Sequence, residues 1–425
     1  WSFSAHTRGK CSRDGLKGGL NVLRRRQVNC VHERRRRRVL LDATRWKTMA
    51  SSQAGKAVYV AATRQHIGKS SVCMGAVSGL QKLCKNVGFM KPVGQRHSII
   101  RGSRVDSDVV LMQQQFQLAE DFRHMSPLVI HNKYTRELYG AGIDQDKIKG
   151  HYTRTRDLII DAFETVQADK DFTVVEGTGH MGVGSVIGFS NAEVAKIINT
   201  PMCIGTNGGF GRMYDELHVA VAYAESVGAS VNSIIVNKVR PSKLEEVQHF
   251  LQSSFIAQTG ISCAGVIPYG QMLDSPTLKD FEDLFATKLL AGFAHRFDHY
   301  HDIQIVATGL RRFIEKLDTG LYNNAAFVTH ASRADICLGF MSHSRVYQAE
   351  TGKPFPAALI VAGADTGVAG GGNIKKEFPH VMAAIKLSDA PVLYVEKTVA
   401  EVVHELTNNV AKLVADDTER SNAAI

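Results

Sequence analysis

The sequence lacks the cysteine pattern of a disulfide scaffold or a zinc site. Its 425 residues include seven cysteines, and no two of them form a Cys-x-x-Cys pair. Scattered cysteines in an odd number are typical of a reducing compartment, and zinc motifs need paired ligands at short spacing. We therefore expect free thiols, no structural zinc and a cytoplasmic location.

Long apolar runs are also missing. A helix that spans a bilayer needs roughly eighteen or more consecutive apolar residues, and no stretch of this chain approaches that length. We therefore expect a soluble protein that does not enter membranes. A chain of this length is long for a single domain, so we expect two domains.

Most of the chain carries no excess of positive charge. The formal net charge is +10, but residues 1–48 alone carry +11, from 14 Lys or Arg against 3 Asp or Glu, so residues 49–425 carry −1. Nucleic-acid-binding surfaces are usually strongly basic. The charge therefore gives no indication that the body of the protein binds nucleic acid.

The basic leader, residues 1–48, contains five consecutive arginines at 34–38. Such a run is typical of a nucleic-acid-binding arm or of an Arg-rich transit peptide. The first Met is Met49, and a predicted strand follows it closely, as it would after a true start. We expect the leader to be disordered or untranslated; if it is a real transit peptide, the protein is organellar.

The strongest motif lies between a predicted strand at 58–62 and a predicted helix at about 68–82. The intervening loop ends in Gly68-Lys69-Ser70, as in a phosphate-binding loop. There, backbone N–H groups face the phosphates, the Lys reaches the outer phosphate oxygens, and the hydroxyl ligates Mg²⁺. The first Gly of the consensus is replaced by Thr63, but the strand and helix around the loop favour a nucleotide site over a plain turn. The predicted nucleotide contacts in this loop are Thr63, Arg64, Gln65, His66, Ile67, Gly68, Lys69, Ser70 and Ser71.

Charged residues stand at the ends of two further predicted strands. Lys91 follows the strand at 87–90, and Glu176 ends the strand at 172–176. Ligands bind at the carboxyl edge of an open parallel sheet. An acid there is suited to ligate magnesium or to orient water, and Lys91 is either a solvated surface charge or a functional cation. From the residues alone, Asp106-Ser107-Asp108 is explained as a helix N-cap.

Strands and helices continue to alternate, with strands predicted at 201–206, 233–239 and 265–269. This pattern predicts an α/β fold with a parallel sheet that is covered by helices on both faces. The alternation restarts after Pro276 and predicts a second, smaller α/β domain. We place the first domain at 49–280, a connection with solvated histidines such as His299 at 281–302, and the second domain at 303–425.

Residues 56–275 resemble the dethiobiotin synthetase-like P-loop family, which also forms the N-terminal part of some long phosphate acetyltransferases. The family's phosphate loop, Gly-Thr-x-Thr-x-x-Gly-Lys-Thr, is followed from residue 62 to 70, with Ala62 for Gly and Gln65 for Thr. In this longer loop the first Gly stands one residue earlier, at position 62, so Thr63 matches the family's Thr and no longer replaces a Gly. Further matches follow in order: Lys91-Pro92-Val93, Ser107-Asp108, Glu176-Gly177-Thr178-Gly179, Asn237 and Ile267-Pro268.

The resemblance implies a P-loop NTPase-type domain that binds Mg²⁺ and ATP. It implies that Ser70, Asp108 and Glu176 hold the Mg²⁺, and that Lys69 and Lys91 are the catalytic cations. Asn237, whose amide suits a purine edge or simply starts a loop, is implied to contact adenine. Pro268 is implied to precede the ribose loop.

Two regions limit the resemblance. Where the synthetases have small hydroxyl residues for a diamine substrate, this chain has Gly94-Gln95-Arg96-His97. The added bulk and positive charge predict a small anionic co-substrate, or none. Residues 285–400 resemble, more weakly, the DRTGG domain found beside such P-loop domains, on Arg333-Ala334-Asp335 and residues 363–367.

Several functions remain open at this point. The first is an ATP-dependent ligase or an ATPase with a regulatory C-terminal domain. The alternatives are a nucleotide-sensing module related to phosphate acetyltransferases, a true dethiobiotin synthetase, and a decayed site, against which Ser70, Asp108 and Glu176 argue. We expect a nucleotide as ligand, no nucleic-acid or membrane partner, and a homo-oligomer.

Overall fold

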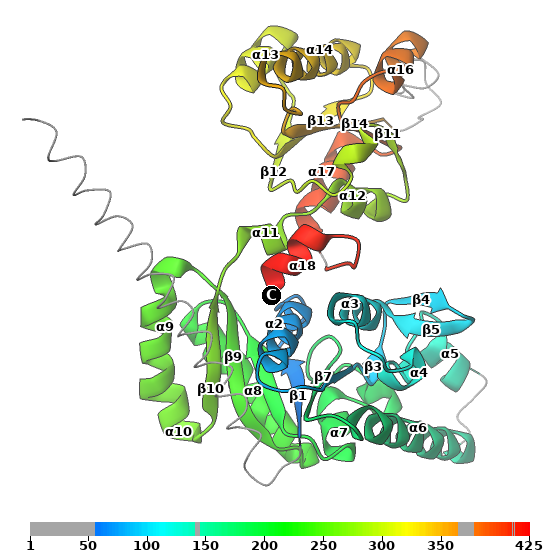
Figure 1. The fold of residues 1–425 in the computed structure, drawn as a ribbon, viewed down its shortest axis with the longest axis vertical. Coiled ribbons are helices and arrows are strands. Elements are labelled where there is room, and N and C mark those ends of the chain that lie inside the picture. Colours follow the sequence, from blue (N-terminus) through cyan, green and yellow to red (C-terminus); the bar gives the residue numbers. More distant parts are fainter. Residues whose placement is uncertain (1–55, 141–144, 364–377, 410, 412) are drawn as a thin grey trace, which may run out of the picture.

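The computed structural model of the chain describes residues 56–140, 145–363, 378–409, 411 and 413–425 (Figure 1). The basic leader and residues 364–367 of the DRTGG-like motif lie outside these residues. In the described part of the chain, no helix is both long and apolar enough to cross a membrane.

The first sheet has six strands in the order β10-β9-β8-β1-β7-β2, and all of its neighbours are parallel. Strand β1 lies inside the sheet and is buried along its whole length, as its apolar sequence predicts. This arrangement confirms the predicted fold class. The strands are β1 (Ala57–Ala62), β2 (Val87–Met90), β7 (Phe172–Glu176), β8 (Met202–Thr206), β9 (Val231–Val239) and β10 (Ser262–Pro268).

Helices cover both faces of this sheet because alternate residues of β1 point to opposite sides. Tyr59 and Ala61 join one apolar core, whereas Val58 and Val60 join the other. The first core includes helices α6 (Gln145–Gln167), α7 (Asn191–Ile197), α8 (Phe210–Val227) and α9 (Leu244–Phe250). The second includes helices α2 (Lys69–Gln81), α3 (Ser107–Phe116) and α4 (Phe122–Met125).

A small excursion separates β2 from the next strand of the sheet. Its hairpin, β4 (His97–Ile100) and β5 (Ser103–Asp106), pairs His97 with Asp106. Arg101 and Gly102 at the turn both have positive φ, as tight hairpin turns require. The hairpin therefore returns the chain to the carboxyl edge of the sheet. The excursion also contains β3 (Val93–Gly94), β6 (Leu128–Val129) and α5 (Tyr134–Tyr139).

The second α/β unit is confirmed as a five-stranded sheet in the order β11-β15-β14-β13-β12. Its strands are β11 (Leu289–Ala291), β12 (Asp302–Ile305), β13 (Ala325–His330), β14 (Ala357–Ala362) and β15 (Val392–Val395), of which only β11 is antiparallel to its neighbour. One face packs on α13 (Leu310–Asp318), α14 (Ala334–Thr351) and α16 (Pro379–Lys386). The other packs on α12 (Leu278–Leu284) and α17 (Val399–Asn408).

The path of the chain differs from the predicted division in two places. Strand β11 lies within the predicted connection, 281–302, yet it joins the second sheet. Helix α18 (Thr418–Ala424) returns to the first unit and packs on α2 and on α11 (Gln271–Asp274) (Figure 1). His299, expected to be solvated, is instead buried, and its Nε2 lies 3.1 Å from Oδ2 of Asp417, the N-cap residue of α18.

Candidate functional site

A cavity of about 260 Å³ opens at the carboxyl edge of the first sheet. Most of the predicted site residues line it, although they come from separate parts of the chain. The lining includes Gln65, His66, Gly68, Lys69, Ser70, Ser71, Lys91, Asp108, Glu176, Asn237 and Pro268.

The loop before α2 is shaped by Gly68, the N-cap residue of that helix. Its φ of 92° lies in the left-handed region that favours glycine. A Cβ added to Gly68 would also lie 2.6 Å from Asn237 Nδ2, so no side chain fits there. The unpaired N–H groups of the first turn of α2 therefore form the kind of helix N-terminus that binds anions.

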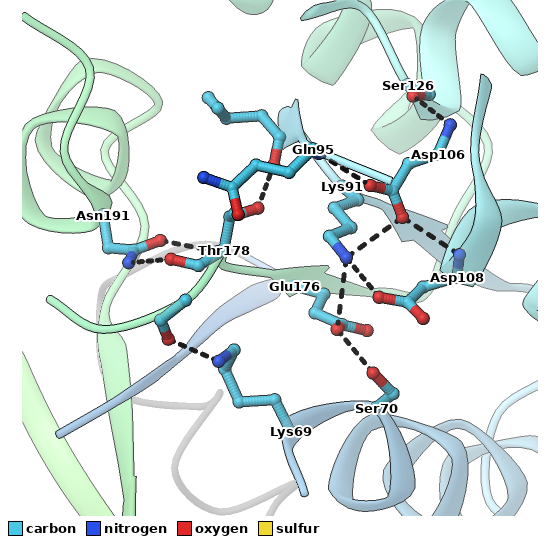
Figure 2. Close-up of polar contacts among 12 residues, drawn as sticks. Lys69, Ser70, Lys91, Gln95, Asp106, Asp108, Ser126, Glu176, Thr178 and Asn191 are labelled. Atoms are coloured by element: carbon cyan, nitrogen blue, oxygen red, sulfur yellow. Dashed lines mark hydrogen bonds and ion pairs between the residues drawn. The ribbon is translucent and has the colours of Figure 1, made fainter. Parts of the chain in front are cut away.

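Lys69 extends from α2, and its ammonium donates a hydrogen bond to the carbonyl oxygen of Gly179 (Figure 2). Burial lowers the pKa of Lys69; the carboxylate of Glu176 opposes this shift, and the charge of Lys91 adds to it. Gly179 belongs to the turn that follows β7, so this contact joins the phosphate-binding loop to the second sequence motif.

Lys91 lies at the centre of a buried group of charges, which we call the cavity cluster. Its Nζ hydrogen-bonds to Asp108 and lies 3.0 Å from Asp106 Oδ1 and 3.7 Å from Glu176 Oε1 (Figure 2). Burial alone would lower the pKa of Lys91, but the three carboxylates outweigh it and hold that pKa well above its usual range. The cavity cluster comprises Lys91, Asp106, Asp108 and Glu176.

Glu176 ends β7 with its carboxylate buried. Oε1 accepts a hydrogen bond of 2.9 Å from the Ser70 hydroxyl, whereas Oε2 is buried without a hydrogen-bond partner. Burial and the negative charge of Asp108 raise the pKa of Glu176 to about 8, against the opposing charges of Lys91 and Lys69. A buried carboxylate oxygen without a donor is costly, so this group is suited to a ligand that supplies positive charge.

Asp106 is a site residue that sequence analysis treated only as part of an N-cap. It does cap α3, since Oδ1 accepts from the Asp108 backbone N–H at 2.9 Å, and Oδ2 accepts from the Gln95 N–H at 3.0 Å. The same carboxylate also pairs with Lys91. Gly94 permits this approach, because a Cβ there would lie 2.6 Å from Asp106 Oδ2. The acid pair Asp-x-Asp after Lys91 was the available signal.

Asn191 holds the turn after β7 in place through all of its amide groups. Its Oδ1 accepts from Tyr59 Oη at 3.0 Å and from the Thr178 N–H at 2.9 Å. Its Nδ2 donates to the carbonyl oxygens of Thr178, at 2.8 Å, and His180, at 2.6 Å. These bonds fix the turn that presents the Gly179 carbonyl to Lys69.

Three predicted loop contacts do not line the cavity. Thr63 donates to Glu216 Oε2 at 3.0 Å, and Arg64 forms an ion pair with the same carboxylate at 3.4 Å. Ile67 is 1% exposed and belongs to the buried core. The side chains of these three residues therefore contact the protein itself, and their contact with a ligand stays a prediction.

Asn237 lines the cavity, but its amide binds the protein itself. Nδ2 donates to the Ile67 carbonyl at 2.8 Å, and Oδ1 accepts from the Lys238 N–H at 2.8 Å. Its predicted role as an adenine contact is untested. Sequence analysis missed the neighbouring pair of Lys238 and Asp274, whose Nζ and Oδ1 lie 2.6 Å apart at the cavity. No spacing rule relates these two residues.

Comparisons with known proteins agree with this geometry. Residues 56–277, just over half of the chain, match the family model AAA_26, described as AAA domain. The chain is 21% identical over 375 residues to a phosphate acetyltransferase of Nitratidesulfovibrio vulgaris. The aligned region covers 87% of this chain and 49% of that protein. The chain therefore spans about half the length of that relative.

A second curated relative is an ATP-dependent dethiobiotin synthetase of Bacillus subtilis subsp. natto, 26% identical over 188 residues, which are 44% of this chain and 77% of that protein. Among solved structures, the MinD cell division protein of Aquifex aeolicus matches with 12% identity and a TM-score of 0.31 over 52% of this chain and 84% of that chain. The resemblance to the dethiobiotin synthetase-like P-loop family is confirmed, whereas the DRTGG-like domain stays a prediction. The chain belongs to the AAA domain family AAA_26, a family of P-loop NTPases.

Proposed function

We propose that the cavity binds ATP together with Mg²⁺. The observation that carries this proposal is the orphaned buried oxygen of Glu176 beside the Ser70 hydroxyl at the start of α2. Hard oxygen donors of this kind suit Mg²⁺, which also binds phosphates and water. Ser70, Asp108 and Glu176 would hold the ion, which would neutralise charge on the phosphates.

The described residues contain no group of three or more His, Cys, Asp or Glu side chains that could hold a metal ion. A cation bound by one hydroxyl and two carboxylates would therefore need phosphate or water oxygens to complete its coordination. This agrees with the usual coordination of Mg²⁺, which is held by one or two carboxylates together with substrate phosphates.

We propose phosphoryl transfer to a small anionic co-substrate, or to water, as the reaction. Lys69 would contact the phosphates, and Lys91 would hold the metal-binding carboxylates in position, since both ammonium groups line the cavity. Gln95 and Arg96 also line it, and Arg96 helps to lower the pKa of Asp108. A cation at this position favours an anion over a protonated diamine.

A module that binds ATP and releases no product is a second candidate. It is favoured by α18, because the end of the chain returns from the second unit and packs on the helix of the phosphate-binding loop. ATP hydrolysis, measured as released phosphate with and without candidate anions, separates the two proposals. Turnover supports the enzyme, whereas tight binding without turnover supports the module.

Substitution of Lys69 tests nucleotide binding directly. Lys69→Ala should weaken Mg·ATP binding roughly a hundredfold, because a buried cation that contacts phosphate is removed. Calorimetry on the full chain measures this. Lys82→Ala, at the other end of the same helix and outside the cavity lining, is the matched control and should bind like the parent. Equal binding by Lys69→Ala would refute the proposed phosphate site.

The co-substrate proposal is tested with diaminopelargonate, bicarbonate and Mg·ATP. We expect no dethiobiotin above background, because Arg96 places positive charge at the cavity. Dethiobiotin formed at more than about 0.1 per second, a rate typical of enzymes, would instead make the protein a true dethiobiotin synthetase.

A further inference from the structure

The end of the chain lies against the cavity although it follows the second α/β unit in sequence. Helix α18 lies between the two sheets, beside α11 and above α2 (Figure 1). Gly75 of α2 faces this chain end, because a Cβ there would lie in van der Waals contact, at 3.4 Å, with the carbonyl oxygen of Ala424. The chain end is therefore fitted closely to the helix of the phosphate-binding loop.

Buried charges anchor this chain end; we call them the junction cluster. The side chain of Arg420 is fully buried and donates to the Ser275 carbonyl at 2.7 Å and to Asp280 Oδ2 at 2.9 Å. Its Nε lies 3.2 Å from Asp417 Oδ2. The junction cluster comprises Asp280, His299, Asp417 and Arg420. It ties α18 to the segment that leaves the first sheet.

Leu413, just before α18, lines the cavity together with Leu273 of α11. Among the residues that the structure describes, these are the only two leucines in the lining, which is otherwise mostly polar or charged. Leu413 also packs on the apolar core beneath α2. An apolar side chain is thus brought from the far end of the sequence to a polar cavity.

The elements that line the cavity bring different charges to it. The phosphate-binding loop and the cavity cluster bring two lysines and three acids. Strand β9 and helix α11 bring the pair of Lys238 and Asp274, whose charges cancel, together with Leu273. Phosphates that carry a divalent cation suit the first group of residues, whereas an uncharged, flat group suits Leu273 and Leu413.

We propose that Leu413 and Leu273 form the apolar wall on which the base of the bound nucleotide packs, so that the chain end completes the nucleotide site. This inference rests on the proposed function, since it assumes that the phosphates bind at Lys69. Aromatic bases have apolar faces, and such contact excludes water from them. The site is then incomplete in any fragment that ends before residue 413.

Two probe ligands separate the base from the phosphates. On the full chain, Leu413→Ala should weaken Mg·ATP binding about tenfold, because apolar contact area is lost, and should leave magnesium tripolyphosphate binding within about twofold. Val414→Ala, a matched apolar truncation at a neighbouring residue outside the cavity lining, should bind both ligands like the parent. Lys69→Ala should weaken both.

The outcomes are distinguishable by calorimetry, with thermal melting to verify that each variant is folded. Unchanged Mg·ATP binding by Leu413→Ala would contradict the proposed apolar wall. Equal weakening of the binding of both ligands would also contradict it, because it would indicate an indirect effect on the phosphate-binding loop. If the parent binds neither ligand, the proposed function itself fails and this inference with it. If Leu413→Ala is unfolded, Leu273→Ala provides the same test from α11.

Discussion

The cavity cluster and the junction cluster are both largely buried groups of acids around one strong cation, yet they differ in charge balance and in position. In the junction cluster, Arg420 meets two carboxylates and a backbone carbonyl, and none of the four residues lines the cavity. In the cavity cluster, Lys91 faces three carboxylates. A buried polar atom without a hydrogen-bond partner occurs in both clusters, Oε2 of Glu176 and Nδ1 of His299, but of these two residues only Glu176 lines the cavity.

This difference teaches that burial of charge does not by itself mark a functional site. A buried ion pair with good geometry holds two parts of a fold together, and removing one partner is costly. A cluster with surplus charge beside a cavity is instead completed by a ligand. We therefore assign a structural role to the junction cluster, whereas the binding role of the cavity cluster is the one proposed above.

The largest expected effect is loss of stability when the junction cluster is broken. Arg420→Met should lower the free energy of unfolding by about 3–5 kcal/mol, because Asp417, which is buried, and Asp280, whose side chain is 13% exposed, would lose their cation. Denaturant unfolding measures it. Arg311→Met, at a residue whose side chain is 91% exposed in its pair with Glu315, should change stability by less than about 1 kcal/mol. Equal losses of stability in the two variants would contradict the structural role assigned to the junction cluster.

A smaller effect comes from neutralising one carboxylate near each cluster. Glu176→Gln should weaken Mg·ATP binding about tenfold or more, because a proposed Mg²⁺ ligand is lost. It should not lower the free energy of unfolding, because the raised pKa of Glu176 means that its charged form is unfavourable in the metal-free fold. Glu282→Gln is the matched control, since Glu282 is also buried and pairs with Arg296 outside the cavity. It should cost about 1–3 kcal/mol of stability and leave binding intact. If Glu282→Gln weakened Mg·ATP binding and Glu176→Gln lowered only stability, the binding role would belong to Glu282 and the structural role to Glu176.

The effect that is smallest per unit of pH is a dependence of stability on pH, with opposite signs in the two clusters. The folded-state pKa of Glu176 is raised to about 8, so the metal-free native state binds more protons than the unfolded chain between about pH 4.5 and 8. Stability from this group therefore falls as pH rises through that window, by at most about 1.4 kcal/mol per pH unit.

Asp417 behaves in the opposite way. Burial tends to raise its pKa, but hydrogen bonds from His299 and from the Arg420 backbone, with the charge of Arg420, hold it below the usual range. The stability that it contributes is present above about pH 4 and is lost as pH falls through its lower native pKa. Unfolding curves of metal-free parent, Glu176→Gln and Asp417→Asn measure both slopes. A slope in the parent between pH 4.5 and 8 that Glu176→Gln does not reduce would contradict the assignment to Glu176.

Local patterns predicted much of this protein. The apolar residues at 58–62 specify a buried strand, and the string Gly68-Lys69-Ser70 between strand and helix specifies a phosphate-binding loop, because both signals depend only on neighbouring residues. The ends of the strands likewise placed Lys91 and Glu176 at one edge of the sheet, since parallel strands share that edge.

Other features depend on contacts between distant residues. Asp106 reads locally as a helix cap, and only the hairpin return brings it to Lys91. Asn237 remains a predicted adenine contact, but its hydrogen bond to the Ile67 carbonyl joins residues 170 positions apart, which no local pattern predicts. Leu413 belongs to no sequence motif that would predict a place at the cavity. By itself the sequence determined the strands, the helices and the phosphate-binding loop, which arise from local periodicity and backbone chemistry. Only the tertiary structure decided which charges are matched and which chain end closes the cavity, because burial and pairing are set by segments that meet only after folding.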